Sequence, residues 1–162
     1  MKTAYLALGS NIGDREANLR DAVRRMESEG IRVVARSSLY ETVPQELLDQ
    51  PSFLNAVVEV ETDLFPMQLL ARVQQIERAM GRRRVTPKGP RNIDIDILFY
   101  GRAVIGTAEL EVPHPRIAQR RFVLEPLAEI APDFRHPVTG KTAGEMLAGL
   151  GPQGVRRLDV GL

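Results

Sequence analysis

The chain has 162 residues, of which 43% are hydrophobic and 27% are charged, and its formal net charge is +1. This length and composition indicate one folded domain spanning 1–162. The sequence has no cysteine and two histidines, which excludes disulfides and cysteine zinc sites and leaves carboxylates as metal ligands. The small net charge argues against nucleic-acid binding through global charge, and no apolar run is long enough to span a membrane. Because the amino-terminal residues also lack a secretory cleavage pattern, we expect a cytoplasmic location. We also expect a monomer.

Strand and helix patterns alternate through the first hundred residues. A two-residue alternation of apolar side chains predicts strands, whereas N-cap, proline and glycine signals delimit the helices. The predicted strands cover 3–9, 31–40, 53–62 and 93–99, and the predicted helices run from Asp14 to Gly30 and from Pro66 to Gly81. This β-α-β-β-α-β order predicts an α+β protein with a ferredoxin-like sandwich, in which both helices cover one face of an antiparallel sheet. The other face is then left for ligands.

The residues after Tyr100 are less regular and predict a C-terminal helical appendage to the same domain. We expect a short hairpin within 102–112, a helix near 117–130 and a small helix near 142–150. The usual strand order of the ferredoxin-like motif places the first strand between the last strand and the strand that carries Phe53 and Asn55. Because Ala7 and Gly9 of this first strand are small, they would leave room for a ligand above it, between the side chains of the two neighbouring strands.

The segment GPRNIDIDILFY, Gly89 to Tyr100, places two aspartates in a strand pattern. In such a strand Ile93, Ile95, Ile97 and Phe99 line one side, and Asp94 and Asp96 share the other. Two like charges on one face favour a hard divalent ion such as Mg²⁺, which binds one or two carboxylates together with water and phosphate oxygens. Nearby cations suit a polyphosphate bridged to that ion: Arg82, Arg83, Arg84, Lys88 and Arg91. The alternative is a solvated edge strand whose charges discourage aggregation.

Other polar residues are candidates with structural alternatives. Gln74 and Glu77 share one helix face, which solvent exposure alone would explain. His114 lies between two prolines, which suits a fixed polar contact, although a single histidine is more often structural. Arg120 and Phe122 offer a cation and a ring to a site, or simply cap and pack a helix. The segment LGSNIGD lacks the spacing of glycine-rich phosphate loops and is interpreted as a tight strand-to-helix turn.

Four sequence blocks closely resemble the 6-hydroxymethyl-7,8-dihydropterin pyrophosphokinase family of folate biosynthesis. In chain order they are LGSNIGDREANL, FLNAVVEVET, GPRNIDIDILFY and VPHPR…RRFVLEPLAEIAP. The resemblance runs from about Ala4 to Pro132. It implies transfer of the β,γ-diphosphate of ATP to the hydroxymethyl oxygen of the pterin, with release of AMP, two Mg²⁺ ions and closure of mobile loops.

The resemblance also implies roles for individual residues. Asp94 and Asp96 match the metal-binding pair, and with Arg82 and Arg91 they form the expected catalytic set. The positions that match ATP-binding residues are Gln74, Glu77, Arg84, His114 and Arg120. The positions that match pterin-binding residues are Thr42, Pro44, Phe53, Asn55 and Phe122.

The sequence departs from the family pattern at three places. The stretch from Arg84 to Gly89 is one residue shorter, with Lys88 where a tryptophan is common, and 45–48 lacks the usual prolines and glycines. Glu109 stands where some members have arginine. Two alternative functions remain open: a ferredoxin-like module that binds RNA or a small ligand, and a kinase that transfers only the γ-phosphoryl group and releases ADP.

Overall fold

The computed structural model describes residues 1–43, 51–82 and 91–162. The elements are β1 Lys2–Ser10, α1 Arg15–Met26, β2 Ile31–Arg36, β3 Ser38–Thr42, β4 Phe53–Thr62, α2 Pro66–Ala79, β5 Asp94–Tyr100, β6 Ile105–Gly106, β7 Glu111–Val112, the 3₁₀ turn Ile117–Gln119, α3 Arg121–Ile130, α4 Ala143–Ala148 and β8 Val155–Gly161. Within the described ranges the main sheet has the order β5-β1-β4-β3-β8, and β2 also pairs with β4. All of these pairs are antiparallel. The α+β class expected from the sequence is confirmed.

The predicted helix boundaries follow local chemistry. The Asp14 carboxylate caps α1 by accepting a hydrogen bond from the backbone N–H of Ala17 at 3.1 Å. Gly30 and Gly81 follow the two helices with φ of 91° and 74°, a left-handed conformation that residues with a side chain rarely adopt. Pro66 occupies the first turn of α2, where its missing N–H costs no hydrogen bond.

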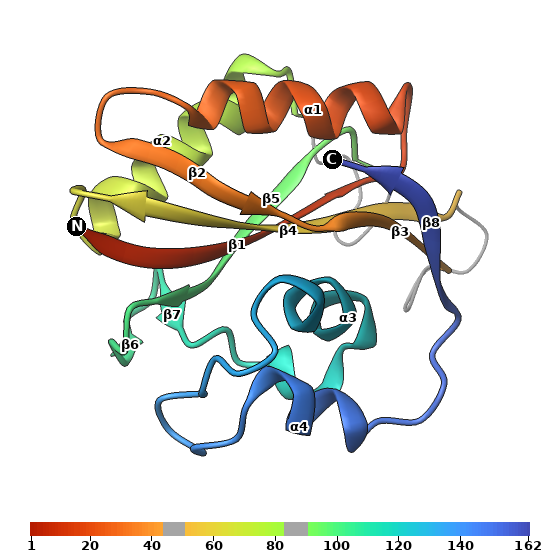
Figure 1. Ribbon diagram of the computed structural model, residues 1–162. Coiled ribbons are helices and arrows are strands. Elements are labelled where there is room, and N and C mark those ends of the chain that lie inside the picture. Colours follow the sequence, from red (N-terminus) through yellow and green to blue (C-terminus); the bar gives the residue numbers. More distant parts are fainter. Residues whose placement is uncertain (44–50, 83–90) are drawn as a thin grey trace.

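Helices α1 and α2 cover one face of the sheet (Figure 1). Their apolar stripes pack on the alternating inward residues of the central strands, as the sequence predicted. The main cluster contains Ala4, Leu6 and Leu8 of β1, Leu54, Ala56, Val58 and Val60 of β4, Leu19, Val23 and Met26 of α1, and Leu69, Val73 and Ile76 of α2. Burial of these side chains is the dominant stabilising term for this layer.

The expectation that the opposite face is left open is wrong for part of that face. Helices α3 and α4 pack against it, as the lower layer of Figure 1 shows. Their side chains Leu124, Leu127 and Met146 form a second apolar cluster with Tyr5 of β1 and Val57 of β4. The open part of this face is therefore confined to the end of the sheet where β1 finishes and β4 and β5 begin.

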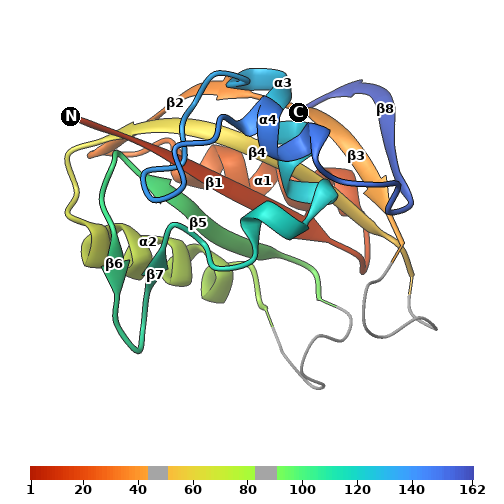
Figure 2. The same ribbon diagram turned by 90° about the horizontal axis from the view of Figure 1, so that it is seen from below.

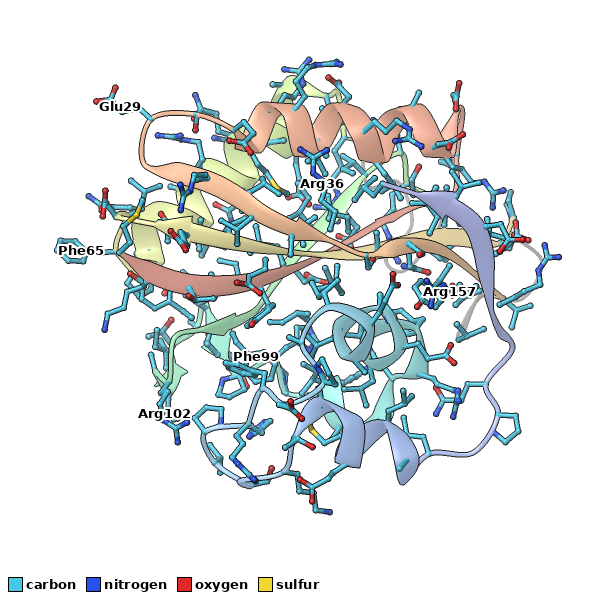
Figure 3. All side chains as sticks on the ribbon, in the orientation of Figure 1. Glu29, Arg36, Phe65, Phe99, Arg102 and Arg157 are labelled. Carbon is cyan, nitrogen blue, oxygen red and sulfur yellow. The ribbon has the colours of Figure 1, made fainter. Side chains whose placement is uncertain are left out.

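A register shift in β5 overturns the predicted position of Phe99. Leu6 pairs with Ile97 and Tyr5 pairs with Phe99, so Leu98 is an extra residue in the ladder. Such a bulge reverses the facing of the residues beyond it. Phe99 consequently lies in the second cluster, with its ring 6.4 Å from that of Tyr5, on the side of α3 and α4 (Figure 3). Asp94 and Asp96 precede the shift and are unaffected by it.

The predicted strand 31–40 is divided into β2 and β3 at Ser37. Both parts pair with β4. Between them, the backbone N–H and the side-chain hydroxyl of Ser37 also form hydrogen bonds to β4. Its N–H donates to the Val57 carbonyl at 3.0 Å, and its Oγ accepts from the Val57 N–H at 2.9 Å.

The C-terminal part contains one strand that the sequence did not predict. The hairpin β6–β7 and helices α3 and α4 lie in the expected ranges, but β8 then returns to the main sheet and pairs with β3. The segment is therefore more than a helical appendage, because it supplies an edge of the sheet (Figure 2). No helix in the described ranges has both the length and the apolar character that crossing a membrane requires.

Candidate functional site

Three neighbouring strands bring the candidate residues into one row on the open part of the sheet face. Gly9 of β1 is the register partner of Asp94 on β5 and of Asn55 on β4. One step along, Ala7 is the partner of Asp96. These small residues form the floor between the acidic pair and Asn55, as expected from the strand order. A Cβ atom added to Gly9 would lie 3.0 Å from Asn55 Nδ2, so a side chain at this position would press on the Asn55 amide.

Thr42 fixes the orientation of the Asn55 amide. Both side chains are buried, and Thr42 Oγ1 donates to Asn55 Oδ1 at 2.5 Å. The Asn55 oxygen is thus occupied, and its Nδ2 donor points toward the space above Gly9. Phe53 lies one strand step away on the same face, opposite Thr42 in the β3–β4 ladder. This end of the site presents an aromatic ring and an oriented amide donor.

Arg82 joins helix α2 to the acidic pair. Its Nη2 donates to Asp94 Oδ1 at 2.8 Å, and its Nη1 lies 3.4 Å from Glu77 Oε1. Glu77 is buried, and its second carboxylate oxygen accepts the backbone N–H of Ile95 at 2.9 Å. The interpretation of Glu77 as a merely solvent-exposed residue is therefore wrong, whereas Gln74 is exposed on α2.

The carboxyl group of Asp96 is strongly perturbed. Burial, the charge of Asp94 and the charge of Glu77 raise its pKa to about 7, against the opposing effect of Arg120 and Arg82. The like-charge conflict inferred from the sequence is therefore present in the folded chain. A cation placed between the two aspartates would remove it.

The described residues fit a magnesium ion that is shared with a phosphate. Among them no group of three or more histidine, cysteine or acidic side chains is arranged to hold a metal by itself. Mg²⁺ needs only one or two carboxylates when substrate phosphates and water complete its shell. Among the described residues, the Nε atoms of Arg82 and Arg91 are buried without a hydrogen-bond partner. Both N–H groups could therefore bind an incoming anion.

Arg91 lies between the two ends of the row. Its guanidinium carbon is 5.1 Å from the centre of the Phe53 ring, and its Nε is 3.9 Å from Asp94 Oδ2. At the other side of the site, Arg120 lies 5.5 Å from the centre of the Phe122 ring, where α3 begins. The two pairs of cation and ring are consistent with weak cation–π attraction in the absence of a ligand.

A cavity of about 270 Å³ opens beside Asp96 at the free edge of β5. Its lining residues come from β5, helix α2 and the segment 107–115 that contains β7; these elements are neighbours in Figure 2. Its lining residues are Leu70, Ile95, Asp96, Ile97, Thr107, Ala108, Glu109, Leu110, Glu111, His114 and Pro115. The lining combines aliphatic side chains with polar groups, as ligand sites commonly do.

His114 faces this cavity in its neutral form. Burial and the charge of Arg120 lower its pKa to about 4. The backbone N–H of His114 donates to the Leu98 carbonyl at 3.0 Å, and its Nδ1 accepts from the Arg116 N–H at 3.3 Å. These contacts restrain His114 locally, and a contact of its ring with a ligand stays a prediction. The remaining nitrogen, Nε2, is then the N–H donor of the ring.

Asn11 contacts the expected site residue Arg91, although its position in the sequence did not indicate this. Its Oδ1 accepts the Arg91 N–H at 2.8 Å, its backbone N–H donates to the Arg91 carbonyl at 3.0 Å, and its Nδ2 donates to the Pro51 carbonyl at 3.1 Å. The side chain is almost fully buried. Its place in a turn immediately before the N-cap Asp14 disguised it as an ordinary turn residue. Of the other expected site residues, Pro44 and Arg84 lie outside the described residues, as do Lys88 and 45–48.

Comparison with known proteins shows similarity to one family over most of the chain. A family model described as 7,8-dihydro-6-hydroxymethylpterin-pyrophosphokinase (HPPK) matches residues 5–132. The chain is 49% identical over 160 residues to the 2-amino-4-hydroxy-6-hydroxymethyldihydropteridine pyrophosphokinase of Methylorubrum extorquens, which covers 98% of this chain and 100% of that protein. It is 50% identical over 137 residues to the Bacillus subtilis protein of the same name, covering 84% of this chain and 82% of the relative.

Longer relatives contain this region as one part. The chain is 50% identical over 139 residues to the folic acid synthesis protein fol1 of Pneumocystis carinii, but spans only 19% of its length. Among solved structures, Plasmodium falciparum HPPK-DHPS aligns with a TM-score of 0.73 over 91% of this chain and 42% of that chain, at 19% identity, which shows a shared fold. The matches to the family model and to the full length of the Methylorubrum protein show that the chain belongs to the 7,8-dihydro-6-hydroxymethylpterin-pyrophosphokinase family.

Proposed function

We propose that this chain transfers the β,γ-diphosphate of ATP to the hydroxymethyl oxygen of 6-hydroxymethyl-7,8-dihydropterin and releases AMP, as a step of folate biosynthesis. Family membership supports the reaction class. The observation that carries the proposal is the row of Asp94, Gly9 and Asn55 across three paired strands. In this row two carboxylates able to bind a metal, Asp94 and Asp96, lie beside the aromatic ring and the amide of Phe53 and Asn55. A cavity opens next to Asp96.

The pterin is assigned to the end of the row at Asn55. Phe53 and Phe122 would stack on the ring, and the Asn55 Nδ2 donor, oriented by Thr42, would bind a ring acceptor. Pro44, from the undescribed segment 44–50, remains a predicted wall of this pocket. Gly9 would let the ring lie close to the sheet, because no side chain rises from the floor there.

ATP is assigned to the cavity beside Asp96. The aliphatic wall would hold the base, and His114 would donate through Nε2 to a nucleotide oxygen or nitrogen. Gln74, Arg84 and Arg120 complete the expected contacts to ATP, and the undescribed Arg84 remains a prediction. Glu77 would act indirectly, because its carboxylate holds Arg82 and the backbone of Ile95. Glu109 adds a negative charge to the mouth of this cavity.

Asp94 and Asp96 would hold the magnesium, with two ions expected. When bound, magnesium would neutralise charge on the phosphates and orient them for in-line attack. Arg82 and Arg91 would stabilise charge on the transferring diphosphate through their Nε–H groups, which are buried without a hydrogen-bond acceptor among the described residues. The raised pKa of Asp96 keeps a neutral carboxyl accessible near pH 7 in the absence of a cation.

The strand order supports assignment of the core to the ferredoxin-like class, with residues 1–162 acting as one pyrophosphokinase domain. A monomeric state and a cytoplasmic location remain predictions from the sequence.

Phosphorus NMR of the purified chain with ATP, Mg²⁺ and 6-hydroxymethyl-7,8-dihydropterin tests the proposed reaction. We expect AMP and a pterin diphosphate to appear together in equal amounts. Formation of ADP would instead indicate γ-phosphoryl transfer. Binding of pterin or ATP without turnover would favour a binding module.

A further inference from the structure

A charged network lies directly behind the proposed pterin pocket, on the side of the sheet that α1 covers. It joins Arg15 at the start of α1, Glu41 of β3, Ser52 immediately before β4, and Arg156 of β8; we call these residues the Glu41 network. Arg15 Nη2 lies 3.0 Å from Glu41 Oε2, and Arg156 Nη2 lies 2.8 Å from Glu41 Oε1. Ser52 Oγ donates to Glu41 Oε2 at 3.3 Å. Arg15 Nη1 also donates to the Ser52 carbonyl at 3.1 Å and to Ser52 Oγ at 3.2 Å.

The network is coupled to the pocket through the backbone. Thr42 pairs with Phe53, and Glu41 pairs with Leu54, in the β3–β4 ladder. Because neighbouring residues of a strand face opposite sides, Glu41 points away from the pocket while Thr42 points into it. Ser52 adjoins Phe53, so the hydrogen bond from Arg15 to its carbonyl restrains the peptide from which the Phe53 ring projects.

The charge arrangement makes Arg15 and Glu41 the centre of the network. Hydrogen bonds from Arg156 and Arg15 lower the pKa of Glu41, so it stays ionised at neutral pH. The side chains of Glu41 and Arg15 are 26% and 31% exposed, whereas that of Arg156 is 73% exposed and screened by solvent. Arg15 uses its guanidinium fork to reach two residues at once, which a lysine at the same position would not reproduce.

We propose that the Glu41 network positions Thr42 and Phe53 for pterin binding, and that β8 takes part in it through Arg156. The proposal rests on the assignment of the pterin to Phe53 and Asn55. It makes β8, which lies outside the residues 5–132 matched by the family model, a contributor to substrate affinity. None of the four side chains is expected to touch the reacting atoms, so they are positioning residues.

A role limited to stability predicts a different pattern. Removal of a stabilising ion pair would lower the melting temperature and leave the affinity of the folded protein unchanged for both ligands. Loss of positioning would weaken pterin binding selectively, because the nucleotide cavity lies at the opposite, β5 edge of the sheet. It would raise KM for the pterin with little change in kcat, because the phosphate-binding residues are untouched.

The test compares full-length Arg15→Lys, Glu41→Gln and Arg156→Ala with two matched surface controls. Arg24→Ala removes an exposed arginine from the same helix, and Glu16→Gln neutralises an exposed glutamate that pairs with Arg20. Calorimetry measures the Kd of 6-hydroxymethyl-7,8-dihydropterin and, separately, that of Mg-ATP. Steady-state kinetics gives KM and kcat, and melting temperatures establish that each variant is folded.

We expect Arg15→Lys and Glu41→Gln to raise the pterin Kd by about threefold to tenfold, with the Mg-ATP Kd unchanged. Arg156→Ala should have a smaller effect in the same direction, and both controls should match the wild type. The milder Ser52→Ala removes only the hydroxyl contacts to Arg15 and Glu41 and keeps the carbonyl contact; if either charged variant fails to fold, it should raise the pterin Kd more than twofold with the Mg-ATP Kd unchanged, and an unchanged pterin Kd would overturn the proposal.

A pterin Kd within twofold of wild type in folded Arg15→Lys and Glu41→Gln would overturn the proposal, as would an equal loss of affinity for both ligands. If the wild-type chain binds pterin and forms AMP while the variants show either of these two results, only the positioning role fails. If the wild type neither binds pterin nor forms AMP, the proposed function fails and the positioning role fails with it.

Discussion

Gly9 is the point at which the acidic pair and the proposed pterin pocket meet, so a single methyl group there tests their relation. In Gly9→Ala the new Cβ would lie 3.0 Å from Asn55 Nδ2 and 3.7 Å from Phe53 Cδ1. The Asn55 amide has little freedom to retreat, because Thr42 holds its oxygen at 2.5 Å. The methyl group would therefore displace Asn55, or occupy the space above the floor.

The expected loss of function is larger than the loss of stability. Overpacking of this kind costs about 1–3 kcal/mol, and reduced freedom of the unfolded chain returns about 0.4–1 kcal/mol. A net loss of about 1 kcal/mol would lower the melting temperature by about 2–4 °C in a chain of this size. Displacement of a substrate by about 1 Å can cost on the order of 100-fold in rate, so we expect kcat/KM for the pterin to fall by roughly tenfold to 100-fold.

The assay is AMP formation followed by phosphorus NMR, with melting temperature and pterin Kd measured on the same preparation. Gly161→Ala is the matched control, because Gly161 lies in β8 of the same sheet and an added Cβ there would meet no atom within 4 Å. Turnover and pterin affinity of Gly9→Ala within twofold of wild type would refute the assignment of the pterin to this floor.

Four further predictions concern other residues of the proposed site. Asp94→Ala and Asp96→Ala should each nearly abolish AMP formation with circular dichroism close to wild type; full activity in either would refute the metal assignment. Because the folded state raises the pKa of Asp96, its burial costs stability as pH rises from the unfolded value toward about 7. Without divalent ions, Asp96→Asn should therefore raise the melting temperature more at pH 8 than at pH 5 in thermal scans, and an equal shift at both would contradict this. Phe122→Ala should weaken pterin binding more than Mg-ATP binding by calorimetry, and Asn11→Ala should lower kcat more than it raises KM for either substrate, because it releases the backbone of Arg91.

Local chemistry was sufficient to predict the elements that surround the site. Alternation in β1 and β4, the Asp14 cap and the glycines after α1 and α2 are signals between residues close in sequence, and the structure has them where expected. The shared face of Asp94 and Asp96 also follows from the two-residue period of a strand. The resemblance to a known family supplied the expected roles, and the family is confirmed.

The bulge at Leu98 and the strand β8 were not predictable in this way. The bulge exists only in the pairing of β5 with β1, and it moves Phe99 to the other face. Most residues of β8 are exposed, so the strand has no burial alternation to reveal it and is held by backbone pairing to β3.

The sequence by itself determined the α+β class, the order of the first strands and helices, and the acidic pair, because these depend on periodicity and capping over a few residues. Only the tertiary structure decided which partners meet. Arg82 reaches both Glu77 and Asp94, Asn11 holds Arg91, and Glu41 joins residues from both ends of the chain. Such contacts depend on strand register and helix packing between distant segments, for which the linear order of residues carries no local signal.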